Sequence, residues 1–139
     1  LVLASSKNAA TEKTDLDQQS PSELMKQPLA LLNNRFEMRR QIDAYFTAHS
    51  LDPRVTLEAN SLGFLIEMVK YGGLRTILPE SIVASMEDLI SIPVEPALPA
   101  HTATMIIRKA AYRSRATDAF LRLALLWDLP SVLGHRRGP

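Results

Sequence analysis

The order of apolar and polar positions predicts a strand that runs through a short polar loop into an amphipathic helix. Residues 28–32 form an apolar run of strand length, and from Met38 to about residue 49 the apolar positions recur at helical spacing. The apolar positions of this helix are Met38, Ile42, Tyr45 and Phe46. The loop between strand and helix contains Asn33, Asn34 and Arg35.

The alternation of strand and helix patterns repeats further along the chain. The further elements expected are strands at 54–58, 74–78 and 89–94, and helices at 62–72 and 79–86. Gly72 and Gly73 are suited to end the first of these helices because glycine tolerates positive φ, and Pro79 is suited to begin the second. Successive strand-helix units predict an α/β fold, with a parallel sheet and right-handed crossovers.

The chain before this pattern contains less regular structure. Residues 1–4 have the apolar composition of a strand, and residues 5–19 have no periodic apolar pattern and are expected to form a loop. Ser20 and Glu23 have the spacing of a capping box, with Pro21 at the first helical position. We expect a single helical turn there, through Met25.

The last third of the chain predicts a hinge, a strand and a helix. Pro96 and Pro99 favour extended backbone, residues 102–108 have a strand pattern, and Ser114 is suited to cap a helix at 115–127. The apolar positions on that helix are Phe120, Leu121, Leu123, Ala124, Leu125, Leu126 and Trp127. This stripe is wider than one face, so the helix needs packing partners on more than one side. Residues 128–139 are expected to form a frayed tail.

Polar residues follow two of the predicted strands where each strand passes into a helix. Asn33, Asn34 and Arg35 follow the first, and Asn60 and Ser61 follow the second. The carboxyl ends of parallel strands meet at one edge of a sheet, and helix N-termini present free N–H groups to anions. The five side chains are therefore expected to converge on a site for a small anion. The alternative is that these Asn and Ser residues only cap helices.

Composition and charge narrow the class of protein. The 139 residues are 46% hydrophobic and 22% charged, as in ordinary globular domains. The formal net charge of +1 provides no sequence-wide basic field, so the chain is not expected to bind nucleic acid through its overall charge, and any contact with DNA would have to come from elsewhere. The chain has no cysteine, no apolar run long enough to span a membrane and no signal-peptide pattern. We expect a cytoplasmic location.

The sequence contains no pattern typical of a catalytic or metal site. Ser61 lacks the Gly-x-Ser-x-Gly pattern of a nucleophile elbow, and the histidines have no partner at ligand or triad spacing. These histidines are His49, His101 and His135. We therefore expect no enzyme, no metal and no cofactor. The densest basic run is Arg108, Lys109, Arg113 and Arg115. It lacks interleaved aromatic residues, so solvated charge is favoured over a nucleic-acid site.

Four blocks, taken together and in this order, resemble the effector-binding region of LysR-type transcriptional regulators, and in particular the cyanate-operon regulators. The blocks are PLALLNNRFEMRRQIDAYF, RVTLEANSLGFLIEMVKYGG, LRTILPESI and AYRSRATDAF. The resemblance covers residues 1 to about 127. Many members of the family have glycine at the position of Ser50.

The resemblance implies a fold like that of type 2 periplasmic binding proteins, in which two crossover strands join two α/β subdomains. Residues 1–4 would be one crossover and residues 5–100 the second subdomain. Residues 101–127 would be the other crossover and a helix of an incomplete first subdomain, and 128–139 the tail. The winged helix-turn-helix that binds DNA is expected to lie outside this chain.

The resemblance also implies a function and a set of binding residues. A small inducer would lie between the subdomains and shift the conformation of a homodimer or homotetramer, with residues 54–71 at the interface. No membrane would be involved. The residues carried over as effector contacts are Asn33, Asn34, Arg35, Phe36, Asn60 and Ser61. A periplasmic solute-binding protein of the same fold, or a fragment of an α/β enzyme, are the alternatives.

Overall fold

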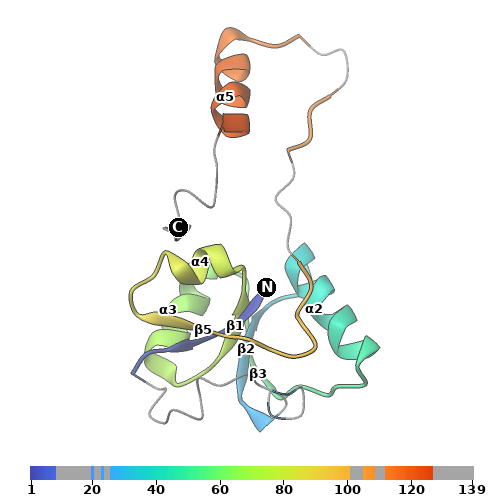
Figure 1. Ribbon diagram of the computed structural model, residues 1–139, viewed down its shortest axis with the longest axis vertical. Helices are drawn as coiled ribbons and strands as arrows, with labels where there is room; N and C mark the ends of the chain where they lie inside the picture. The colour runs from blue at the N-terminus through green and yellow to red at the C-terminus, as the bar shows by residue number, and fades with distance from the viewer. Residues whose placement is uncertain (9–19, 21–22, 24–25, 101–104, 109–111, 127–139) are drawn as a thin grey trace, which may run out of the picture. The chain divides into compact units, whose positions relative to one another are not determined.

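The computed structural model describes residues 1–8, 20, 23, 26–100, 105–108 and 112–126 (Figure 1). The chain divides into two units, Leu1–His101 and Thr102–Pro139. The elements of the first unit are β1 (Val2–Ser6), β2 (Leu29–Leu32), α2 (Glu37–Ala48), β3 (Val55–Ala59), α3 (Leu62–Gly72), β4 (Thr76–Leu78), α4 (Glu80–Ala84) and β5 (Leu89–Ile92). The second unit contains α5 (Arg115–Leu126).

The strands of the first unit form two ladders that meet at Arg75. β2 and β3 pair in parallel, and β1 lies between β4 and β5 and is antiparallel to both. A parallel bridge between Leu29 and Arg75 joins the ladders, and the Ala30 amide donates to the Arg75 carbonyl at 2.8 Å. The strands β2, β3, β4 and β5 therefore run in one direction, and β1 runs against them.

The parallel arrangement predicted from the strand-helix units is confirmed for β2 to β5, whereas the opposed direction of β1 was not predicted. An apolar run is buried equally well in either direction, so its pattern does not reveal the direction of the strand. That direction is set by the connections between strands. The predicted loop was also wrong at its start, since Ser5 and Ser6 belong to β1 and are buried. Their side chains are small, and their backbone pairs with Ile90 and Leu89 of β5.

Two helices cover the strands of the first unit from opposite sides, with α2 on one side and α3 on the other (Figure 1). Met38, Ile42, Tyr45 and Phe46 form the buried face of α2, as their spacing predicted. Leu65, Ile66 and Val69 form the buried face of α3. All four residues of β2 are buried, because this strand has packing partners on both faces. The core is one continuous cluster of apolar side chains.

Several predicted chain reversals and caps are confirmed. Gly73 follows α3 with φ of 65°, in the left-handed region that glycine adopts without strain. Ser50 follows α2 with φ of 53°, which accounts for the glycine that many LysR-type regulators carry there. In the capping box, the Ser20 amide donates to the Glu23 carboxylate at 2.8 Å. The Glu23 amide donates in return to the Ser20 hydroxyl at 3.4 Å.

The strand expected at 102–108 is absent from its described part. Residues 105–108 are irregular and exposed, and the described residues provide them with no neighbouring strand. A strand is stabilised by hydrogen bonds to a neighbour, so its residue pattern is not sufficient without one. Residues 102–104, Trp127 and the predicted tail lie outside the described residues.

The helix α5 begins as predicted and leaves most of its apolar side chains exposed. The Thr117 amide donates to the Ser114 hydroxyl at 3.1 Å, as expected of an N-cap. Leu121 is the one buried residue among those described on α5. The exposed apolar side chains are Phe120, Leu123, Leu125 and Leu126. The described residues of the second unit, 105–108 and 112–126, thus supply too little surface to bury this stripe.

Candidate functional site

The carboxyl ends of β2 and β3 lie side by side in register. Leu32 pairs with Ala59, and the Asn33 amide donates to the Ala59 carbonyl at 2.8 Å. The loop after β2, which runs into α2, and the loop after β3, which runs into α3, therefore leave the sheet at the same edge. The first loop carries Asn33, Asn34, Arg35 and Phe36, and the second carries Asn60 and Ser61.

The loop after β2 is held by its own first residue. The Asn33 side-chain oxygen accepts a hydrogen bond from the Arg35 amide at 3.1 Å, and the Asn33 carbonyl accepts one from the Phe36 amide at 3.2 Å. Phe36 occupies the N-cap position of α2 with extended backbone and no side-chain cap. Asn33 therefore forms a turn and does not cap the helix. Asn34, Arg35 and Phe36 are exposed.

The loop after β3 contains a capping serine. The Ser61 hydroxyl accepts a hydrogen bond from the Phe64 amide at 3.4 Å, and the Ser61 carbonyl accepts one from the Leu65 amide at 3.1 Å. Capping thus accounts for Ser61, and the O–H of this hydroxyl remains able to donate to a ligand. Asn60 is exposed and precedes the cap.

The edge formed by these loops has the chemistry of a donor-rich surface. The first-turn amides of α2 and α3 have no partner inside their helices, and both helix dipoles direct positive potential toward this edge. The guanidinium of Arg35 adds a full positive charge. The acidic residue in the first turn of α2, Glu37, is paired with Arg40 and so neutralised locally. The edge can bind a small anion or a polar group that accepts hydrogen bonds.

Arg39 is a residue of this region that the sequence analysis missed. Its guanidinium contacts Asp43 on the same helix and Glu58 on β3, with distances of 2.7 and 2.6 Å. The spacing of Arg39 and Asp43, one helical turn apart, was visible in the sequence. The contact of Arg39 with Glu58 was not visible in the sequence, because it depends on where β3 lies beside α2.

The far end of α2 is tied to the segment that follows β5. Tyr45 is buried, and its hydroxyl donates to the Pro96 carbonyl at 2.6 Å. Its ring stacks at a tilt on His49, with ring centroids 4.3 Å apart. Burial raises the pKa of Tyr45 above its ordinary value of 10.0, and the negative charge of Glu95 adds to this effect.

Replacing Tyr45 by phenylalanine is expected to change the alkaline stability of the protein. The substitution removes one hydrogen bond and should lower the free energy of unfolding by about 1 kcal/mol near neutral pH. The raised pKa means that the Tyr45 contribution is complete below pH 10.0 and is lost as the pH rises through the higher value of the folded state. Urea denaturation at increasing pH should show the wild type losing more stability than Tyr45→Phe. Parallel pH profiles would contradict this expectation.

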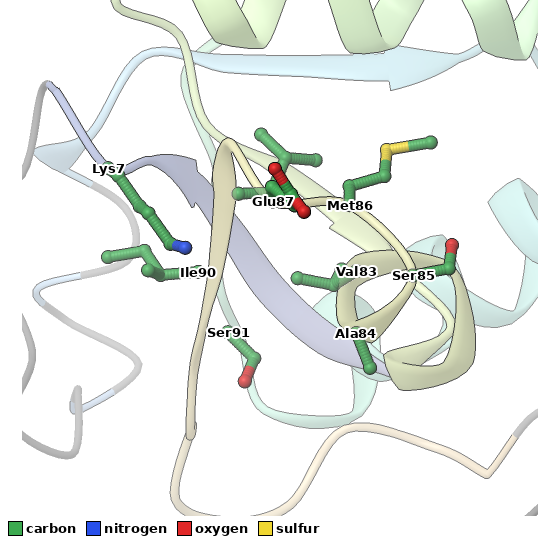
Figure 2. A pocket seen from close by; sticks show the side chains of 9 residues that line it. Lys7, Val83, Ala84, Ser85, Met86, Glu87, Ile90 and Ser91 are labelled. Carbon is green, nitrogen blue, oxygen red and sulfur yellow. The ribbon is translucent and has the colours of Figure 1, made fainter. Parts of the chain in front are cut away.

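An open hollow of about 680 Å³ lies elsewhere in the first unit, at the amino end of β5 (Figure 2). It is lined by Lys7, Val83, Ala84, Ser85, Met86, Glu87, Leu89, Ile90 and Ser91. The carboxyl ends of the parallel strands, and the loops that follow them, lie at the opposite edge of the sheet. None of the candidate binding residues therefore lines this hollow. Size alone does not make it the functional site, because its lining brings together no cluster of converging donors.

The described part of the chain also bears on metal sites, membrane spans and the basic run. No group of three or more His, Cys, Asp or Glu side chains there is placed to hold a metal ion. No helix there combines the length and the apolar character that a membrane span requires. In the basic run, Arg108, Arg113 and Arg115 are exposed, and Lys109 lies outside the described residues.

Comparison with known proteins identifies a family and a fold. The family model described as the LysR substrate binding domain matches residues 1–126. The effector binding domain of QuiR, solved in complex with shikimate, is similar in fold with a TM-score of 0.63 and 16% identity, over 90% of this chain and 59% of that one. HinK, a LysR family transcriptional regulator from Pseudomonas aeruginosa, has a TM-score of 0.51 and 15% identity, over 68% of this chain and 33% of that one.

This chain therefore spans 59% of the QuiR domain and 33% of HinK. The fold is the α/β, type 2 periplasmic-binding-protein-like fold of LysR effector domains.

Proposed function

Because this chain belongs to the LysR substrate-binding domain family, we propose that it is the small-molecule sensing part of a DNA-binding transcriptional regulator. Such a domain reports a bound effector and transforms nothing, so no catalysis is expected of it. In this proposal the chain acts in the cytoplasm, and DNA is bound by a separate amino-terminal domain. The resemblance of its four sequence blocks favours the subgroup of cyanate-operon regulators within the family.

The proposed effector is a small anion held at the edge where β2 and β3 end. The register of Leu32 with Ala59 is the observation that carries this proposal, because it brings two helix N-termini and the Arg35 guanidinium to one edge. The shikimate bound by the QuiR domain is also a small carboxylate. The proposed contacts are Asn33, Asn34, Arg35, Phe36, Asn60 and Ser61.

The proposal includes the subdomain organisation implied by the family. Residues 1–4 would be one crossover, residues 5–100 the second subdomain, and residues 101–127 the return to the first. The exposed apolar stripe of α5 supports this division, since such a stripe needs a packing partner and the described residues of the second unit provide none. Effector binding between the subdomains would favour one orientation and shift the conformation of an oligomer.

Residues 54–71 are proposed as the interface of that oligomer. β3 is an edge strand among the described residues, since it pairs with β2 alone. Three apolar side chains of α3, Phe64, Met68 and Tyr71, recur at helical spacing, and the first and last are exposed. An exposed apolar stripe beside a strand edge is typical of a self-association surface.

The effector site is tested by calorimetric titration of the full-length protein with sodium cyanate, bicarbonate, acetate, benzoate and shikimate. For the anion that binds, Asn33→Ala, Arg35→Ala and Asn60→Ala should each weaken binding about tenfold, as expected for loss of one charged or polar contact. Lys7→Ala is the control, because it removes an exposed cation at the opposite edge of the sheet. Unchanged affinity in all three site variants would exclude this edge.

A further inference from the structure

Arg39 makes contacts that join the ends of the two strands, β2 and β3, from which the loops of the candidate site begin. Its Nη1 donates to the Leu32 carbonyl at 2.9 Å and to a Glu58 carboxylate oxygen at 2.6 Å, and its Nε donates to Asp43 at 2.7 Å. The side chain is only 12% exposed. One guanidinium thus bonds to α2, β2 and β3 together.

The places of these contacts along the two strands relate them to the site. Leu32 is the last residue of β2 and directly precedes Asn33, and Glu58 precedes Ala59 and Asn60 at the end of β3. The strand ends are also linked by the hydrogen bond from the Asn33 amide to the Ala59 carbonyl. Arg39 therefore adds side-chain contacts across the point where the strands separate into their loops.

The chemistry of this contact depends on arginine in particular. Burial opposes the charge on Arg39, but the hydrogen bonds to Asp43 and Glu58 outweigh it and raise the pKa of the guanidinium. The group therefore stays charged. A planar guanidinium directs several N–H donors along fixed lines, whereas a lysine ammonium is a single compact charge on a flexible chain. Lysine could keep the charge but not all three directions.

We propose that Arg39 is a positioning residue, which fixes the loop carrying Asn33–Phe36 relative to the loop carrying Asn60 and Ser61. Its importance for effector binding rests on the function proposed above. The three contacts of Arg39 described above are all with the protein itself. Its effect on a ligand would therefore pass through the geometry of these loops. A ligand that touches both loops would bind more weakly once their spacing is free to vary.

Amide hydrogen exchange of the ligand-free, full-length protein tests this role without a known effector. In the wild type, local opening of these loops has to break the Arg39 contacts, and this slows amide exchange. Without those contacts, exchange at the Asn33 amide of Arg39→Gln should become about tenfold faster. The amides of Arg35, Phe36 and Phe64 should also exchange faster. The β4–β1–β5 ladder should be unchanged. Arg39→Lys should restore only part of the protection.

The control is Lys70→Gln. Lys70 is a partly buried cation paired with Asp88 at 3.2 Å and with Glu67 at 3.7 Å, at the last turn of α3. The Lys70→Gln substitution should leave the amide exchange of both loops unchanged. Faster exchange spread evenly over all strands, full rescue by Arg39→Lys, or the same loop effect in Lys70→Gln would each overturn the proposal.

Titration with sodium benzoate and sodium cyanate separates this inference from the proposed function. If the wild type binds neither of these anions, nor bicarbonate, acetate or shikimate, but Arg39→Gln loosens both loops, the positioning role stands and the anion proposal fails. If the wild type binds an anion and Arg39→Gln binds it equally well with unchanged exchange, the positioning role fails and the anion proposal stands.

Discussion

Replacing Leu65 by alanine should lower the free energy of unfolding by about 3 kcal/mol, the middle of the range for truncating a buried leucine. Leu65 is 0% exposed and lies on the face of α3 that packs on β1, β2 and β3. Its loss leaves a cavity that close-packed neighbours fill only in part. Because α3 begins at the candidate site, this core also holds Ser61 in place.

Urea denaturation followed by circular dichroism measures this effect. Glu67→Ala is the matched control, since Glu67 lies on the exposed side of the same helix and its contact with Lys70 is long, at 3.7 Å. A surface substitution of this kind should change stability by less than about 0.5 kcal/mol. Equal losses in the two variants would mean that α3 does not bury the face described here.

Replacing Tyr71 by alanine should weaken self-association about 30-fold, as expected when an aromatic anchor worth about 2 kcal/mol is removed from an interface. Tyr71 is 82% exposed and Phe64, two turns earlier on α3, is 52% exposed. Exposed aromatic side chains that recur along one helix form an apolar patch, which is typical of a protein interaction surface. Phe64→Ala should have an effect in the same direction.

Sedimentation velocity over a range of protein concentrations measures the dissociation constant. Tyr112→Ala is the control, because Tyr112 is also an exposed tyrosine but lies outside residues 54–71. An oligomer that persists unchanged in both α3 variants would remove this segment from the proposed interface. An oligomer weakened equally by Tyr112→Ala would show that the effect is not specific to α3.

The elements that the sequence predicted well are those set by local periodicity. The limits of α2 and α3 were predicted to within a residue or two, because one face of each helix is apolar and, at α3, the Ser61 cap and Gly73 mark the ends. The five strands described in the first unit were predicted within similar limits. At β5 the predicted alternation was only partly correct, since Ile92 is buried but Ile90 is partly exposed.

The candidate site was predicted as a set of loops but not as a geometry. The polar residues after two strands, and the rule that parallel strands end at one edge, were sufficient to expect the two loops together. The turn formed by Asn33 and the cap formed by Ser61 could be recognised only from the backbone geometry of the structure. The Arg39 contacts required it too, since they join residues from one helix and two strands.

The sequence by itself determined the α/β class, the helix faces and the polar loops, because periodicity, caps and turn residues act over a few neighbouring positions. Only the tertiary structure decided the reversed direction of β1, the inclusion of Ser5 and Ser6 in that strand and the role of Arg39. It also decided that residues 105–108 form no strand. Each of these depends on which distant segment supplies a hydrogen-bond partner, and that information is not carried by the pattern of any single segment.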